Sequence, residues 1–142
     1  MSAMRQETTE FVVETRGRRL YEITAELNGW VRSSGIEHGL LTLYVRHTSA
    51  SLTIQENADP EVQRDLERFL DRLVPQGDPL FKHTMEGPDD MPAHVRSMLT
   101  STSLGIPVAS GQPVFGTWQG VYLYEHRTAP HRRKVVAHLI GD

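Results

Sequence analysis

The sequence predicts a single α+β domain in which a mixed β-sheet carries a few helices. The chain has 142 residues, a length that usually forms one domain around one core. Its hydrophobic fraction of 38% and charged fraction of 23% are those of an ordinary globular protein. Amphipathic segments with helical spacing interrupt short strand-like runs, and the last third is mostly strand-like. We therefore expect one compact domain over residues 1–142.

The N-terminal half predicts strands alternating with two helices. The first helix follows Thr24, a capping residue, and ends at Gly35, where a left-handed conformation is common. The second helix has Asp59 as its cap and Pro60 at its first position, and it ends before Pro75. Period-two alternation or continuous β-branched and apolar residues predict strands over 9–15, 40–45 and 52–54.

The C-terminal half predicts a long loop, one short helix and several strands. The loop covers 75–91 and is rich in Gly, Pro and Asp, and loops of this length are often functional. The short helix begins at Pro92. Strands are expected over 106–108, 114–115, 121–124 and 134–140. The last two strands should form a hairpin through 127–130.

Composition excludes several classes of protein and partner. A net charge of −3 gives no general attraction to nucleic acid or to an anionic membrane. The absence of cysteine leaves only His, Asp and Glu as metal ligands. No apolar run is long enough to span a bilayer, and residues 1–10 are polar, unlike a signal peptide. We expect a cytoplasmic location.

Three histidines are the candidate metal ligands. His47 follows the strand-like run 40–45, whereas His83 and His94 flank an acidic loop. Neutral imidazole nitrogens are preferred ligands of zinc and related ions. The spacing matches no zinc finger and no His-Glu-x-x-His helix, so convergence depends on the fold. The alternative is three unrelated surface or hydrogen-bonded histidines.

The acidic loop offers carboxylates that a cation could stabilise. Glu86, Asp89 and Asp90 lie within five residues, and like charges so close repel one another unless a cation or an arginine is nearby. The segment could equally be a solvated turn. Asp89 and Asp90 could also act only through their favourable position at the N-terminus of the following helix.

Two polar segments could bind a substrate. Thr48 and Ser49, with Asn57 downstream, offer hydrogen-bond donors for phosphate or water, although such residues also cap strand ends. In Gly116-Thr-Trp-Gln-Gly120, Trp118 could stack on a flat ligand and Gln119 could hydrogen-bond to it. The same segment could instead be a bulge in a packed strand.

A polar cluster follows the strand 121–124. Its arginines could bind an anion bidentately, or the cluster could be the solvated tip of a hairpin, which we favour for Arg127 and His131. His138 lies in an apolar strand and is interpreted as a core or interface residue. The cluster comprises Glu125, His126, Arg127, His131, Arg132 and Arg133.

Three motifs in order, at 46–57, 86–94 and 116–123, resemble the YjbQ family, known as secondary thiamine-phosphate synthase-like proteins. The resemblance covers nearly the whole chain. It implies an α+β fold that assembles as a homotrimer, with histidines gathered in a cleft near the subunit interface. Ser49 and Asp90 depart from the usual threonine and the frequent asparagine of the family. Residues that fall on the family's functional positions are His47, His83, His94, Ser97, Trp118, Gln119 and Glu125.

The resemblance also implies a weak or secondary synthesis of thiamine phosphate from a pyrimidine methyl diphosphate and a thiazole phosphate. A divalent ion, zinc or magnesium, held by His47, His83 and His94 would neutralise the leaving diphosphate. Arg96, Arg132 or Arg133 would bind the diphosphate and Trp118 the ring, with Thr48, Ser49, Asn57, Ser97 and Gln119 as further contacts.

Two other functions remain open beside synthesis. The first is metal-dependent hydrolysis of a small phosphorylated metabolite, with Glu125 as the base. In the transferase hypothesis, His47, His83 and His94 bind a metal or act as acid and base, with His47 and His94 as catalytic candidates. The second is a trimeric binding module without turnover. The physiological substrate cannot be assigned from the residues.

Overall fold

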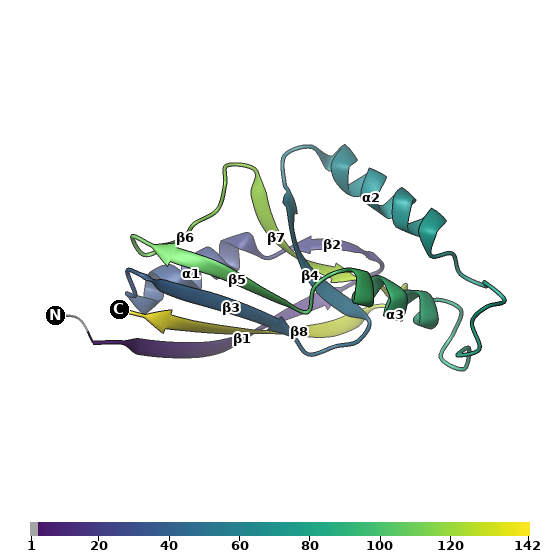
Figure 1. Cartoon of the computed structure of the whole chain (residues 1–142), viewed down its shortest axis with the longest axis horizontal. Coiled ribbons are helices and arrows are strands. Elements are labelled where there is room, and N and C mark those ends of the chain that lie inside the picture. Colours follow the sequence, from purple (N-terminus) through teal and green to yellow (C-terminus); the bar gives the residue numbers. More distant parts are fainter. Residues whose placement is uncertain (1–2) are drawn as a thin grey trace.

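The computed structural model describes residues 3–142 as one α+β domain, so Met1 and Ser2 of the expected 1–142 domain and polar N-terminus lie outside the described residues. The elements are shown in Figure 1. In chain order they are β1 (Arg5–Thr15), β2 (Arg19–Glu22), α1 (Thr24–Ser34), β3 (Gly39–Val45), β4 (Ala50–Glu56), α2 (Pro60–Leu73), α3 (Asp90–Leu99), β5 (Ser103–Ala109), β6 (Gln112–Pro113), β7 (Gln119–Glu125) and β8 (His131–Gly141).

The strands form two antiparallel sheets, so the expectation of a mixed sheet is wrong for the described residues. One sheet has the order β1-β8-β3-β5-β6 and the other the order β2-β7-β4. Every strand pair in the two sheets is antiparallel. A parallel pair needs a crossover that returns to the same sheet. Here α1 leads from β2 to β3, and α2 with α3 leads from β4 to β5, so the helices connect different sheets.

The predicted hairpin between the last two strands is also wrong. β7 pairs with β2 and β4, whereas β8 pairs with β1 and β3. The connection at 126–130 therefore carries the chain from one sheet to the other. Burial agrees with this arrangement, because 120–125 is buried on both faces of β7 while β8 alternates. Each strand is central in its own sheet and has no free edge for the other.

The main core lies between the two sheets and α1. Leu27 and Val31 of α1 pack with Leu41 and Leu43 of β3 and with Leu123 of β7, all fully buried. A smaller cluster lies on the opposite face of the three-stranded sheet, where Leu20, Tyr122 and Tyr124 pack beside Leu70 of α2. The order of layers is therefore five-stranded sheet, core, three-stranded sheet, α2.

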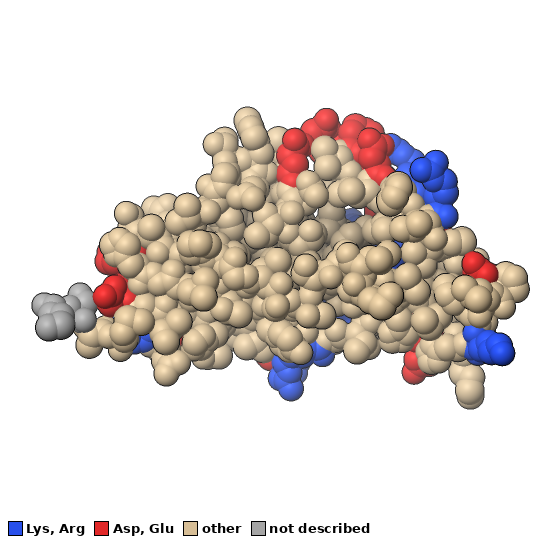
Figure 2. Space-filling model, in the orientation of Figure 1, with Lys and Arg blue, Asp and Glu red and all other residues tan. Residues whose placement is uncertain are grey.

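The predicted second helix is confirmed in its limits, though its apolar stripe remains outside the core. Asp59 accepts a hydrogen bond from the Glu61 N–H at 2.9 Å, and Pro60 occupies the first turn. None of the residues 60–73 is buried. Charged side chains of both signs gather over α2 (Figure 2). On this helix Arg64 pairs with Glu61 and Arg68 with Asp65.

Other element limits differ modestly from expectation. Ile23 rather than Thr24 is the N-cap of α1, because the Thr24 hydroxyl accepts from Val121 N–H and donates to Glu22. Gly35 has φ 73°, as expected for the end of that helix. α3 begins at Asp90, before Pro92. β2 was not expected, and β6 precedes the predicted 114–115.

The end of the domain that carries α3 brings three separate segments together. They are the loop 74–89, the start of α3 and the connection 126–130, which Figure 1 shows at the same end of the molecule. No helix among residues 3–142 is both long and apolar enough to cross a bilayer.

Candidate metal centre

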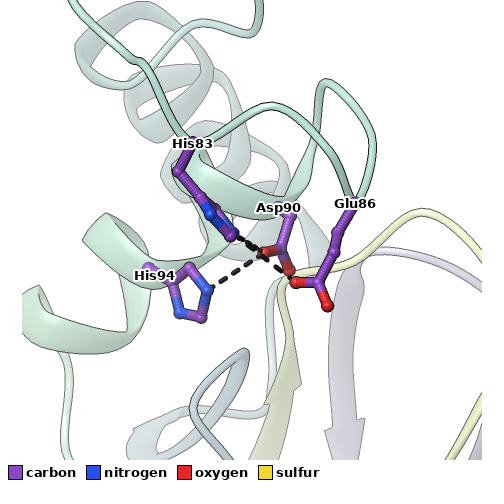
Figure 3. Close-up of side chains that lie close together, drawn as sticks. All are labelled: His83, Glu86, Asp90 and His94. Carbon is purple, nitrogen blue, oxygen red and sulfur yellow. Dashed lines mark hydrogen bonds and ion pairs between the residues drawn. The ribbon is translucent and has the colours of Figure 1, made fainter.

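Four side chains form the one group of this kind in the described part of the chain. His83, Glu86, Asp90 and His94 each offer a donor atom, and these atoms all lie within 4.8 Å of one another. Figure 3 shows the two imidazoles and the Glu86 carboxylate directed toward Asp90. His83 and Glu86 come from the loop, whereas Asp90 and His94 lie one turn apart on α3. Gly87, with φ 103°, allows the loop to turn between Glu86 and α3.

One carboxylate oxygen is the centre of the group. Asp90 Oδ2 lies 2.7 Å from His83 Nε2 and 3.0 Å from His94 Nε2. Glu86 Oε2 lies 3.5 Å from His83 Nε2. The Asp90 side chain is 3% exposed, while that of Glu86 is 65% exposed. The group therefore has a fixed, buried base and a side that is open to solvent.

The backbone fixes the orientation of the His94 ring. His94 Nδ1 lies 3.1 Å from the carbonyl oxygen of Thr48. A carbonyl only accepts, so Nδ1 carries the proton, and in the neutral ring Nε2 presents a lone pair to Asp90 Oδ2. Two acceptors at 3.0 Å require a proton or a cation between them. Such a carbonyl partner is the usual support of a metal-binding histidine.

Arg127 holds the two aspartates in place, so the interpretation of this residue as part of a solvated tip is wrong. Its Nη1 lies 2.9 Å from Asp90 Oδ1 and its Nε lies 2.9 Å from Asp89 Oδ2. Burial would raise the pKa of Asp89, but hydrogen bonds from Arg127 and Thr128 outweigh burial and lower the pKa to about 2. Burial would also raise the pKa of Asp90, but the hydrogen bond with His83 helps to outweigh burial, and the pKa lies below its usual value. Both carboxylates are ionised at neutral pH.

The donor set suits a zinc-like ion. Two imidazole nitrogens with carboxylate oxygens are common ligands of Zn²⁺, which binds four ligands or three with a water. Mg²⁺ prefers an octahedron of oxygen ligands and keeps several waters. Of the two ions expected from the sequence, zinc therefore fits these residues better.

His47 lies outside the group, so the expected convergence of three histidines within one chain is limited to two of them. Its Nε2 accepts a hydrogen bond from the Lys134 N–H at 2.9 Å. Burial, followed by the charge of Arg133, lowers the pKa of His47. His47 lines a separate hollow of about 610 Å³ together with Thr48, Ser49 and Arg133.

Glu125 belongs to a closed, buried cluster rather than to the metal group. Its Oε1 accepts from Thr15 Oγ1 at 2.6 Å and from Arg133 Nε at 2.8 Å. Its Oε2 accepts from the Arg127 N–H at 3.1 Å and from Arg133 Nη2. Arg133 Nη2 also donates to the Ser49 carbonyl and hydroxyl. Burial would raise the pKa of Glu125, but Arg133 and Thr15 outweigh it and lower the pKa.

The other predicted arginine contacts are placed differently. Arg96 is fully buried and joins α3 to α2, with Nη2 at 2.8 Å from Asp71 Oδ1. Its guanidinium is therefore not free to hold a diphosphate in this chain. Ser97 beside it is also buried. Arg132 is largely exposed and lies 3.8 Å from Glu14.

Asn57, Trp118 and Gln119 gather at the far end of β4. Thr48 and Ser49 precede this strand, whereas Asn57 follows it and donates its N–H to the Trp118 carbonyl at 3.0 Å. Seven strand residues separate the two ends by roughly 20 Å. Trp118 is 63% exposed. Within one chain the aromatic group therefore lies far from the metal group.

Sequence reasoning considered Glu86 and Asp90 but did not include them among the expected ligands. The signal was the four-residue spacing of Asp90 and His94, which puts both side chains on one face of a helix. The helix was expected to start at Pro92, and that boundary placed Asp90 in the loop. Nothing in the sequence indicates the contact of Arg127 with Asp90, since 37 positions separate them.

Similar proteins were found for almost the whole chain. Residues 9–142 match the family model described as UPF0047 protein YjbQ-like. A UPF0047 protein of Synechocystis is 48% identical over 99% of this chain and 96% of its own length. The UPF0047 protein YjbQ of Escherichia coli O157:H7 is 44% identical over 96% and 98%.

Two solved structures share the fold. One is a protein of the YjbQ/UPF0047 family from Clostridium acetobutylicum, with a TM-score of 0.84, 35% identity and coverage of 92% of this chain and 98% of that one. The other is a YbjQ-like protein of unknown function from Sulfolobus solfataricus. It has a TM-score of 0.89 at 22% identity, covering 99% and 100%.

Proposed function

The chain belongs to the UPF0047 family of YjbQ-like proteins, and we propose that it binds a divalent metal ion and acts on a small phosphorylated metabolite at that ion. The observation that carries the proposal is the sharing of Asp90 Oδ2 by two imidazole Nε2 atoms, one of which is oriented by the Thr48 carbonyl. His83, Glu86, Asp90 and His94 are the proposed ligands.

The open side of the group gives the ion a chemical role. A purely structural zinc site is closed by four protein ligands, whereas His83 and Glu86 are about half or more exposed to solvent. A bound ion would act as a Lewis acid that neutralises a phosphate group or lowers the pKa of a bound water. The buried Asp90 and the backbone-held His94 would keep the ion in place while an exposed ligand yields to substrate.

Hydrolysis and thiamine phosphate synthesis both fit this role, and they differ in whether they need Trp118. Hydrolysis of a phosphorylated metabolite needs an ion and a water bound to it, and the four proposed ligands of the ion lie in one chain. Synthesis of thiamine phosphate also needs a platform for the pyrimidine ring, and Trp118 lies roughly 20 Å away along β4. Synthesis therefore depends on a neighbouring copy that brings its Trp118 to this metal group. Binding without turnover is the third candidate.

A homotrimer is the proposed assembly. The face of the five-stranded sheet that points away from the core exposes Val12, Leu40, Tyr44 and Ile140. The apolar stripe of α2 is likewise unburied, with Phe69 and Leu73 exposed. Burial of such surfaces between copies is favourable. Sedimentation analysis is expected to give three times the 16.1 kDa mass of the chain, and a monomer would contradict the assembly. A cytoplasmic location is proposed with it.

Metal binding is tested by calorimetric titration of Zn²⁺ into tag-free protein that has been stripped with a chelator. Wild type is expected to bind one ion per chain. His83→Ala and His94→Ala should each weaken binding about 100-fold, because a ligand matters at least as much as a residue that supports one. The matched control is His38→Ala, since His38 is exposed and does not belong to the metal group. Wild-type protein without a binding event, or alanine variants that bind normally, would contradict the proposal.

The reaction is tested on the metal-loaded protein with the two thiamine precursors, alone and together. A joined product supports synthesis, and release of phosphate or diphosphate from one precursor alone supports hydrolysis. Binding of a precursor without any product supports the binding module.

A further inference from the structure

Arg127 makes three contacts that converge on the metal group. Its Nη1 forms an ion pair with Asp90 Oδ1, and its Nε and Nη2 donate hydrogen bonds to Asp89 Oδ2 and the Glu86 carbonyl, each at 2.9 Å. The first contact touches a proposed ligand directly, and the third holds the backbone of another. One guanidinium thus binds the loop and the start of α3 at once.

The position of Arg127 is itself fixed by the sheets. It lies two residues after the end of β7, and its N–H donates to Glu125 Oε2 at 3.1 Å. The next residue, Thr128, donates its N–H to Asp89 Oδ2 at 3.0 Å. Because Glu125 is fully buried and paired with Arg133, this anchor belongs to the rigid part of the domain. The metal group is therefore attached to the sheets through the connection 126–130.

The ion pair with Arg127 leaves one oxygen of Asp90, Oδ2, to face the metal group. Oδ1 is occupied by the guanidinium, and only Oδ2 faces the two imidazoles. Asp90 can therefore coordinate an ion in the group through only one of its oxygens. Zn²⁺ accepts this arrangement because it needs few ligands and favours imidazole nitrogen. Mn²⁺ favours carboxylate, carbonyl and water oxygens in an octahedral set, so it gains more from a carboxylate that can rotate or offer both oxygens.

We propose that Arg127 determines which ion the group accepts: by occupying Asp90 Oδ1 it restricts Asp90 to single-oxygen ligation and favours a zinc-like ion over an oxygen-preferring one. This inference rests on the proposed metal site and adds a residue that positions the ligands without touching the ion.

The shape of the guanidinium, rather than its charge, carries the effect. A positive charge near the group opposes every divalent ion to a similar degree, so its loss changes the affinity for Zn²⁺ and Mn²⁺ together. The orientation of Asp90 affects the two ions differently. A lysine keeps the charge but has one compact ammonium, which cannot hold three partners in the fixed geometry of the arginine fork. The ratio of the two affinities separates geometry from charge.

The experiment measures Zn²⁺ and Mn²⁺ affinity for wild type, Arg127→Gln and Arg127→Lys. Arg132→Gln is the control, because Arg132 is largely exposed and contacts no ligand of the group. Both Arg127 variants are expected to lose about tenfold in the preference for Zn²⁺ over Mn²⁺, while the control keeps the wild-type ratio. An unchanged ratio in both variants would overturn the inference.

The wild-type affinities and an X-ray absorption measurement distinguish a failure of the metal site from a failure of the role of Arg127. If wild-type protein binds neither ion, the metal site itself is contradicted. If wild type binds Zn²⁺ and the Arg127 variants keep the wild-type ratio of Zn²⁺ to Mn²⁺ affinity, only the role of Arg127 is contradicted. X-ray absorption of Zn²⁺-loaded wild type needs no folded variant. It is expected to show two imidazoles and single-oxygen carboxylates, and Asp90 bound through both oxygens would overturn the inference.

Discussion

Asp90 and Glu125 are both buried carboxylates paired with an arginine, yet their surroundings differ in one respect. Glu125 accepts hydrogen bonds from Thr15, from the Arg127 N–H and from Nε and Nη2 of Arg133, and these protein groups fill its two oxygens. Asp90 has Oδ1 bound by Arg127, while Oδ2 faces two imidazole nitrogens that a proton or a cation must bridge.

The difference shows how the same residue types serve structure in one place and binding in another. A buried carboxylate whose oxygens are all bonded by fixed donors has no position left for a ligand, and it joins segments of the fold. A carboxylate that faces imidazole nitrogens at the surface presents a ready set of metal ligands. Burial alone does not separate the two clusters, but the identity of the partners does.

The largest expected effect comes from Glu125→Gln. The substitution leaves the buried Arg133 charge without its partner, and breaking a buried pair on one side costs about 3–5 kcal/mol. Urea unfolding should show this loss, with Glu14→Gln, a largely exposed carboxylate, as the control. A loss below about 1 kcal/mol would mean that this cluster is not the closed structural one.

A somewhat smaller loss of stability is expected when the pH is lowered, because His126 is buried. Burial, then the charge of Arg96, lowers the pKa of His126 from 6.5 to about 3, and its Nε2 lies 2.8 Å from Ser51 Oγ. Between these values the unfolded chain binds a proton that the folded chain does not. The free energy of unfolding therefore falls as pH falls below 6.5, by about 1.4 kcal/mol per unit, or about 3 kcal/mol at pH 4.5.

His126→Gln should remove this part of the acid dependence. Denaturant unfolding from pH 8 to 4.5 is expected to give a shallower curve for the variant below pH 6.5 and parallel curves above pH 7. Identical slopes for the two proteins below pH 6.5 would show that His126 takes up protons in the folded state. The surroundings of His126 would then be less closed to solvent than its contacts indicate.

The smallest effect on stability is expected in the open group. Glu86→Gln replaces an exposed carboxylate, so the free energy of unfolding without metal should stay within about 0.5 kcal/mol of wild type. The same variant should bind Zn²⁺ at least about tenfold more weakly. Thermal unfolding with and without Zn²⁺ measures both quantities. A large loss of stability without metal would place Glu86 with the structural cluster.

The sequence allowed the helices and most strands to be predicted because their signals are local. The cap at Asp59, the proline at 60 and the left-handed Gly35 each act within one or two turns. The pairing of strands is not local. The apolar runs of β7 and β8 look like a hairpin, and only the packing of both sheets around one core assigns them to different sheets.

The candidate site was predicted in part for the same reason. His83 and His94 were selected by residue type and by their place beside an acidic loop, and the structure brings them together. The roles of Asp90 and Arg127 depend on a helix that starts two residues early and on a contact across 37 positions. The position of His47 depends on a backbone N–H of β8, which no pattern near His47 indicates.

The most direct test of the metal centre is a crystal of tag-free protein grown with Zn²⁺ and measured on both sides of the zinc absorption edge. An anomalous peak should lie among His83 Nε2, His94 Nε2, Glu86 and Asp90 Oδ2. No peak there, or a peak only beside His47 in the separate hollow, would contradict the account.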